Sequence, residues 1–215
     1  MDIDFTTFDP DLRYKLLVGL IVPRPIAFVS TYNANGVANC APFSFFNVIS
    51  HEPPLVIISF GTRKNSGDDR GGAKDTLRNI LRTGEFVVNM VDEATANGMH
   101  VASGEFSEEE SEFDKAGFTP VPAVRVAHPR IAESPASFEC LLRERTELAP
   151  GRVFLFGEIV RLHTADGIID PVTRRVSETL YQPVGRLWGN RYCTTRQRFV
   201  LPGALPEALP LADNP

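Results

Sequence analysis

The segment RPIAFVST at residues 24–31, followed by NCAPFSFF at residues 39–46, decides the fold of this chain. The first segment is rich in β-branched and aromatic residues, which favours a β-strand. The residues NANG at 33–36 separate the two segments, and Asn-Gly supplies the positive φ angles of a tight hairpin turn. We therefore expect an antiparallel hairpin whose second strand carries small hydroxyl and amide side chains.

The rest of the chain continues as short strands with a few short helices between them. Strands at short spacing, without regularly interposed long helices, favour a mainly β antiparallel barrel over a doubly wound parallel sheet. Helix 76–83 has Asp75 or Thr76 as its predicted cap and Gly84 as its stop, and Ser107 with Glu110 forms a capping box that opens a helix closing at Gly117. Further strands are predicted at 55–60, 85–91, 138–143, 153–163 and 198–201, and a third helix at 92–103.

Composition limits the classes of protein to consider. The 215 residues are 43% hydrophobic and 23% charged, which suits a single domain spanning 1–215, with a core at about 20–200 and a Pro-rich tail at 202–215. A net charge of −5 argues against nucleic acid as a partner. No apolar run reaches the roughly 20 residues that cross a bilayer, and the first residues do not resemble a signal peptide. We expect a cytoplasmic protein with no membrane partner, in which three scattered cysteines stay reduced.

Several common chemistries have no signature in this sequence. The four histidines have no metal-ligand spacing, so no metal site is predicted. Fingerprints of a Rossmann cradle, a P-loop, a nucleophile elbow and a zinc protease are also missing. We therefore predict no catalytic side chain of those kinds.

A group of hydroxyls and positive charges lies between residues 59 and 76. Ser59 and Thr76 offer hydroxyls, Arg63 and Lys74 offer positive charges, and Asp75 lies at the start of the predicted helix. A helix that begins there presents free N–H groups and its positive dipole end to an anion. The segment is consistent with a phosphate-binding site, but taken alone it is better explained as a polar loop that ends in an ordinary helix cap.

The order of these motifs closely resembles the flavin reductase-like, FMN-binding split-barrel family. Later segments continue the resemblance, which covers roughly residues 20–200. The segments concerned are RPIAFVST, APFSFF, the Pro-Pro pair at 53–54, KDT at 74–76, GEFVVN at 84–89, EFDKAGF at 112–118, SFEC at 137–140 and FGEIV at 156–160. Cys40 departs from the family pattern, which more usually has an aliphatic residue at this place.

The resemblance implies a Greek-key split barrel that forms a homodimer, with FMN near the subunit junction. The isoalloxazine and ribityl contacts would come from Asn39, Ala41, Pro42, Phe43 and Ser44, and the phosphate contacts from Ser59, Arg63, Lys74, Asp75 and Thr76. Nicotinamide or another substrate would lie on the side of His163, Arg186 and Tyr192. Arg186, Trp188 and Tyr192 would either border the flavin or close the barrel.

The activity that the resemblance implies depends on the cofactor and needs no protein acid or base. A hydride would pass from NADH or NADPH to the N5 atom of FMN, while the protein binds and orients both. A monooxygenase partner could then use the reduced flavin. Two alternatives stay open: an electron carrier or flavoprotein that retains FMN and acts on an organic substrate, and a ligand-binding barrel with no enzymatic activity.

Overall fold

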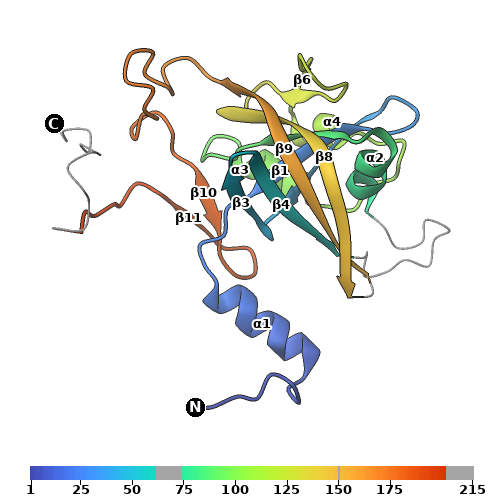
Figure 1. Cartoon of the computed structure of the whole chain (residues 1–215), viewed down its shortest axis with the longest axis vertical. Coiled ribbons are helices and arrows are strands. Elements are labelled where there is room, and N and C mark those ends of the chain that lie inside the picture. Colours follow the sequence, from blue (N-terminus) through green and yellow to red (C-terminus); the bar gives the residue numbers. More distant parts are fainter. Residues whose placement is uncertain (62–73, 150, 202–215) are drawn as a thin grey trace.

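The computed structural model describes residues 1–61, 74–149 and 151–201 (Figure 1). Its main element is a seven-stranded antiparallel sheet with the strand order β2-β1-β5-β8-β9-β4-β3. The neighbours β1 and β5, and β4 and β9, are distant in sequence, as in a Greek-key arrangement. These strands are β1 (Ala27–Tyr32), β2 (Ala38–Phe43), β3 (Phe46–His51), β4 (Pro54–Gly61), β5 (Glu85–Asn89), β8 (Ala136–Ala149) and β9 (Arg152–Thr164).

Smaller elements surround this sheet. Two short hairpins add β6 (Pro120–Val121) with β7 (Arg130–Ile131), and β10 (Val184–Arg186) with β11 (Tyr192–Thr194). The helices are α1 (Pro10–Leu20), α2 (Asp75–Thr83), α3 (Ala96–Val101) and α4 (Glu112–Ala116). Figure 1 shows α1 extending away from the sheet, with α2 against its opposite side. The mainly β antiparallel fold with short peripheral helices is thus confirmed.

The barrel is filled by apolar side chains that alternate along its strands. On β4 the buried positions are Val56, Ile58 and Phe60, and the residues between them point the other way. Phe86 packs against β9 at Gly157, where an added Cβ would lie 2.4 Å from the end of the Phe86 ring. Only glycine permits this contact, so the sequence of β9 is fitted to the core at this position.

The predicted hairpin and helix stops are confirmed. Thr31 pairs with Asn39 across β1 and β2, and Gly36 in the turn has a φ of 78°. Gly84 and Gly117 end α2 and α4 with a φ of 72° each. These features depend on neighbouring residues alone, which is why the sequence reveals them.

Four predicted boundaries were wrong. The segment 39–46 is broken after Phe43, and Phe46 begins β3, which pairs with β4 instead. The hydrogen bonds of Ser107 with Glu110 close only a turn, and α4 begins at Glu112. In α2 the N-cap residue is Lys74 rather than Asp75 or Thr76. The third helix is shortened to α3.

Residues 198–201 form no strand, contrary to the prediction. Phe199, Val200 and Leu201 are 85%, 65% and 65% exposed, so their apolar side chains find no surface to pack against. The predicted tail at 202–215 lies outside the described residues.

Helix α1 is an element that the sequence analysis did not predict. Its signals were Asp9, whose side chain accepts a hydrogen bond from the Leu12 N–H at 2.9 Å, and Pro10 in the first turn. None of its residues is buried within the chain. Within the part of the chain that the structure describes, no helix combines the length and apolar character needed to cross a membrane.

Candidate functional site

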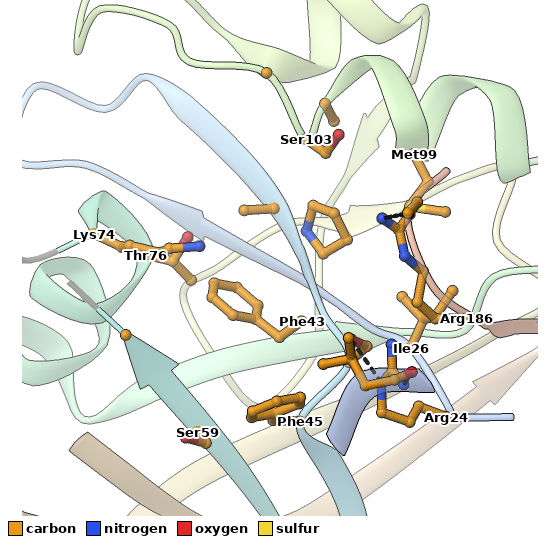
Figure 2. A pocket seen from close by; sticks show the side chains of 18 of the residues that line it. Arg24, Ile26, Phe43, Phe45, Ser59, Lys74, Thr76, Met99, Ser103 and Arg186 are labelled. Atoms are coloured by element: carbon orange, nitrogen blue, oxygen red, sulfur yellow. Dashed lines mark hydrogen bonds between the residues drawn. The ribbon is translucent and has the colours of Figure 1, made fainter. Parts of the chain in front are cut away.

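A cavity of about 1260 Å³ opens between β2, the end of β4, the start of α2 and the β10–β11 hairpin. Figure 2 shows side chains from these elements pointing toward a shared space. Most of the predicted site residues line this cavity: Asn39, Ala41, Pro42, Phe43, Ser44, Ser59, Lys74, Asp75, Thr76, Arg186 and Tyr192. Of the other two, Arg63 lies outside the described residues, and His163 is not among the lining residues.

Asn39 is the centre of a buried hydrogen-bond network behind the cavity wall. Its Oδ1 accepts from the hydroxyls of Thr31 and Thr76 at 3.1 and 3.0 Å. Its Nδ2 donates to Glu112 Oε1 at 2.9 Å, and Asn79 Nδ2 donates to Thr31 Oγ1 at 3.0 Å. The network joins β1, β2, α2 and α4, so it fixes the relative positions of the elements that carry the cavity.

Glu112 is the residue of this network that the sequence analysis did not assign to the site. Its side chain lines the cavity and is almost fully buried, and Oε2 has no hydrogen-bond partner among the described residues. Burial raises the pKa of Glu112 above its usual value, and the charge of Asp75 acts in the same direction. The cavity wall therefore contains a carboxyl group that holds its proton more firmly than an exposed glutamate does.

One end of the cavity gathers hydroxyl and cationic groups. Ser59 Oγ is buried without a hydrogen-bond partner among the described residues, and Lys74 Nζ lies 5.1 Å from the centre of the Phe43 ring. Arg152, at the start of β9, stands opposite Gly61 of β4 and also lines this end. We call Ser59, Lys74 and Arg152 the basic end of the cavity; these donors suit a phosphate.

Arg152 was missed by the sequence analysis because its place depends on strand register. Its Nη1 lies 2.8 Å from the position that a Cβ on Gly61 would take, so the guanidinium lies against a backbone without a side chain. Its Cζ lies 6.0 Å from the centre of the Phe45 ring. Only the pairing of β4 with β9 brings these residues together, and no local sequence pattern predicts this contact.

Two further arginines lie at the other end of the cavity. Arg24 is 7% exposed, and its guanidinium donates to the carbonyls of Val18, Ile21 and Leu187 at 2.7, 2.8 and 2.6 Å, and to Ser44 Oγ at 3.4 Å. Arg186 forms a backbone bridge with Arg24. In Figure 2, Lys74 and Thr76 lie on one side of the drawn group, and Arg24 and Arg186 lie on the other.

The three phenylalanines after Pro42 have different environments. Phe43 is 5% exposed and packs against Phe60, with ring centroids 4.5 Å apart, whereas Phe45 is 39% exposed and lines the cavity. Phe46 packs against the barrel core. Cys40 is fully buried in a second apolar cluster, and burial raises the pKa of its thiol.

His163 has a different position from the other predicted residues. Its Nε2 lies 2.5 Å from Oε1 of the fully buried Glu139, and that carboxylate also accepts backbone N–H groups of Val124, Arg125 and Val126. Burial alone would raise the pKa of Glu139, but the hydrogen bonds from His163 and the backbone outweigh it and lower the pKa. Glu139 therefore ties residues 124–126 to the sheet, and His163 contacts this carboxylate from the neighbouring strand β9.

The polar atoms of the cavity fit a flavin nucleotide better than a metal ion. Ser59 Oγ and Glu112 Oε2 are buried oxygens of lining residues without a partner in the part of the chain that the structure describes, and the basic end offers donors to a phosphate. Within residues 1–61, 74–149 and 151–201, no group of three His, Cys, Asp or Glu side chains is placed to hold a metal.

Comparison with known proteins agrees with this geometry. Residues 19–182 match the flavin reductase like domain family. A 2-nitrobenzoate 2-nitroreductase from Pseudomonas fluorescens is 36% identical, with a TM-score of 0.85 over 99% of this chain and 100% of its own. Component B of a nitrilotriacetate monooxygenase from Bacillus cereus is 32% identical, with a TM-score of 0.84 over 94% and 98%.

A third structure identifies the fold. A flavin-reductase-type protein with a split barrel domain from Shewanella frigidimarina has a TM-score of 0.76 over 95% of this chain and 100% of its own, at 22% identity. At that identity the similarity shows the fold alone, and it confirms the predicted split barrel.

Proposed function

The chain belongs to the flavin reductase-like family, and from that premise we propose that its cavity binds FMN and that NADH or NADPH reduces the bound flavin. The observation that carries the proposal is the basic end of the cavity, where Ser59, Lys74 and Arg152 surround a space beside the start of α2. These groups match a phosphate dianion. The flavin supplies the hydride chemistry when bound, and the protein supplies binding and orientation.

The predicted residues would contact different parts of FMN along the cavity. Asn39, Ala41, Pro42, Phe43 and Ser44 follow one another along β2 and its end, where they would accompany the ring and the ribityl chain. Ser59, Lys74 and Thr76 would hold the phosphate, together with Arg63 from outside the described residues.

Asp75 and Glu112 are the two acids on this part of the wall. The carboxylate of Asp75 pairs with Arg78, so we expect the backbone N–H of Asp75 to face the phosphate. Glu112 fixes the amide of Asn39 through the hydrogen bond to Oε1. Both acids would therefore help binding through other groups, and neither is required to transfer a proton.

A simple pair of measurements tests this function. Titration of the purified protein with FMN should perturb the visible flavin spectrum at stoichiometric amounts, and the loaded protein should oxidise NADH or NADPH. A protein that stays colourless and leaves the flavin spectrum unchanged would instead favour a ligand-binding barrel without enzymatic activity.

A second candidate function is a flavoprotein or electron carrier that keeps its FMN and acts on an organic substrate. The cavity exceeds the roughly 300–1,000 Å³ of a typical small-molecule site, which leaves space beside a flavin. The similar nitroreductase supports this reading, whereas the similar monooxygenase component B supports transfer of reduced flavin to a monooxygenase partner. Retention of FMN through gel filtration would distinguish the first from the second.

We also propose that the protein is a homodimer. Helix α1 exposes Leu12, Tyr14, Leu17 and Leu20 at 44%, 54%, 44% and 77%, and edge strand β3 exposes Val48 at 63%. An isolated helix of 11 residues is only marginally stable in water, so α1 needs a surface to cover its apolar side chains. Sedimentation equilibrium should give twice the chain mass of 23.7 kDa, and a monomer mass would contradict the proposal.

The proposed location is the cytoplasm. Cys40, Cys140 and Cys193 are all free, and the first two are buried. Free thiols persist in a reducing compartment, where a small-molecule electron donor such as NADH is also available. Recovery of the protein in a periplasmic or secreted fraction would contradict this location.

A further inference from the structure

The end of the cavity opposite the basic end holds a second concentration of positive charge. Arg24 and Arg186 lie close enough for their charges to interact, and neither forms an ion pair within the described part of the chain. Burial lowers the pKa of Arg24, and the neighbouring charge of Arg186 lowers it further. Two cations kept together in this way are stabilised by an anion between or beside them.

Arg186 is held in position while part of its guanidinium stays available. Its Nη1 donates to the Tyr192 hydroxyl, its Nη2 donates to the Gly189 carbonyl, and its Cζ lies 4.6 Å from the centre of the Tyr192 ring. A guanidinium has five N–H donors, of which these bonds use two. Fixed in this orientation, the group loses little conformational entropy when it binds a ligand.

The groups around Arg186 favour a flat organic molecule over a small inorganic ion. Trp188 lines the cavity two residues further along the hairpin and is 44% exposed. Ile26 and Met99, although almost fully buried, form part of the apolar wall behind it, and Figure 2 shows Arg186 on their side of the cavity. Arg191 Cζ lies 5.8 Å from the centre of the Trp188 ring, and the exposed part of the indole is suited to stacking against a planar ring.

A flavin phosphate bound at the basic end would not neutralise the positive charges of Arg24 and Arg186. Lys74 and Arg186 stand on opposite sides of the group drawn in Figure 2, so one phosphate does not serve both. The cavity volume of about 1260 Å³ also allows a second ligand.

We propose that Arg186, backed by Arg24 and flanked by Trp188, forms a subsite for the anionic group of a planar second substrate. The inference rests on the proposed function, because the second substrate has to lie beside the flavin. The subsite would bind a carboxylate or phosphate joined to a planar ring. Two kinds of molecule carry such a group: an aromatic carboxylic acid and a nicotinamide dinucleotide with its phosphates.

Calorimetric titration of the FMN-saturated protein tests the subsite. The probes are benzoate, its neutral analogue benzamide, and a tetrahydronicotinamide dinucleotide that cannot donate a hydride. The variant is Arg186→Gln, and the matched control is Arg161→Gln, an exposed position of β9 away from the cavity. We expect Arg186→Gln to weaken binding of an anionic probe by about tenfold, with benzamide unaffected and the control like the natural protein.

The outcomes show which of the two anions binds, and they distinguish a failure of the subsite from a failure of the proposed function. A loss confined to benzoate identifies an aromatic acid, and a loss confined to the dinucleotide identifies its phosphates; both support the subsite. Equal binding of both anionic probes to Arg186→Gln and to the natural protein overturns the subsite while the flavin proposal stands. Failure of the natural protein to take up FMN at the loading step overturns the proposed function itself.

Discussion

Asn39→Asp should lower the free energy of unfolding by about 3 kcal/mol near pH 8, although it changes almost nothing in shape. Aspartate keeps the oxygen that accepts from Thr31 and Thr76, but it loses the N–H that donates to Glu112 Oε1 at 2.9 Å. Two carboxyl groups then face each other in a buried site. Because both cannot be ionised there, one has to hold a proton.

The loss of stability in Asn39→Asp should depend on pH and should increase as the pH rises. A carboxyl pair whose pKa is raised on folding binds more protons in the folded than in the unfolded state, so stability falls as pH rises. The loss should be smallest below about pH 5 and should grow toward alkaline pH. In the natural protein the raised pKa of Glu112 also makes stability fall as pH rises, but by a smaller amount. Urea unfolding across this pH range measures the trend.

A double variant tests whether the network itself causes the loss. In Asn39→Asp/Glu112→Gln the glutamine amide donates to the new aspartate, so the hydrogen bond returns with donor and acceptor exchanged. Most of the stability should return, and FMN affinity should follow it. Glu112→Gln alone keeps an acceptor for Asn39 and should be close to the natural protein, with a flatter pH dependence. A double variant as unstable as Asn39→Asp would show that the network does not determine stability.

The parts of the fold that were predicted correctly depend on residues close in sequence. Asn35-Gly36 required a tight turn, and Gly84 and Gly117 required helix ends, because each places glycine where φ is positive. The Ser107 to Glu110 motif shows the limit of such reasoning. Its hydrogen bonds form, but the packing of Phe113 and Glu112 sets the start of α4 further along the chain.

The parts of the site that were missed depend on contacts between distant segments. Glu112 reaches Asn39 across 73 positions, and Arg152 meets Gly61 only through the register of β4 with β9. Both are charged residues in positions where sequence alone predicts a solvent-exposed face. His163, predicted on the substrate side, does not line the cavity; it contacts Glu139 on the neighbouring strand, and no local pattern in the sequence indicates that contact.

Arg152→Gln should weaken FMN binding by roughly 10- to 100-fold and leave riboflavin binding almost unchanged. The two flavins share every group except the phosphate, so their difference isolates the charge at the basic end. Arg152 forms no ion pair within the described residues, and its charge is therefore available to a ligand. Flavin fluorescence quenching gives both dissociation constants. The matched control is Arg145→Gln on β8, whose exposed side chain pairs with Glu147 at 2.9 Å.

Gly61→Ala offers an independent way to reach the same group without removing a charge. Its new Cβ would lie 2.8 Å from Arg152 Nη1, a contact that the flexible arginine can relieve only by moving its guanidinium. FMN affinity should fall while riboflavin affinity and stability change little, because β4 keeps its hydrogen bonds to β9. If both variants weaken the two flavins equally, Arg152 supports the cavity wall and does not bind the phosphate. If neither variant changes FMN binding, the phosphate does not bind at the basic end. The flavin would then lie along β2 in the opposite direction, with its phosphate toward the other end of the cavity.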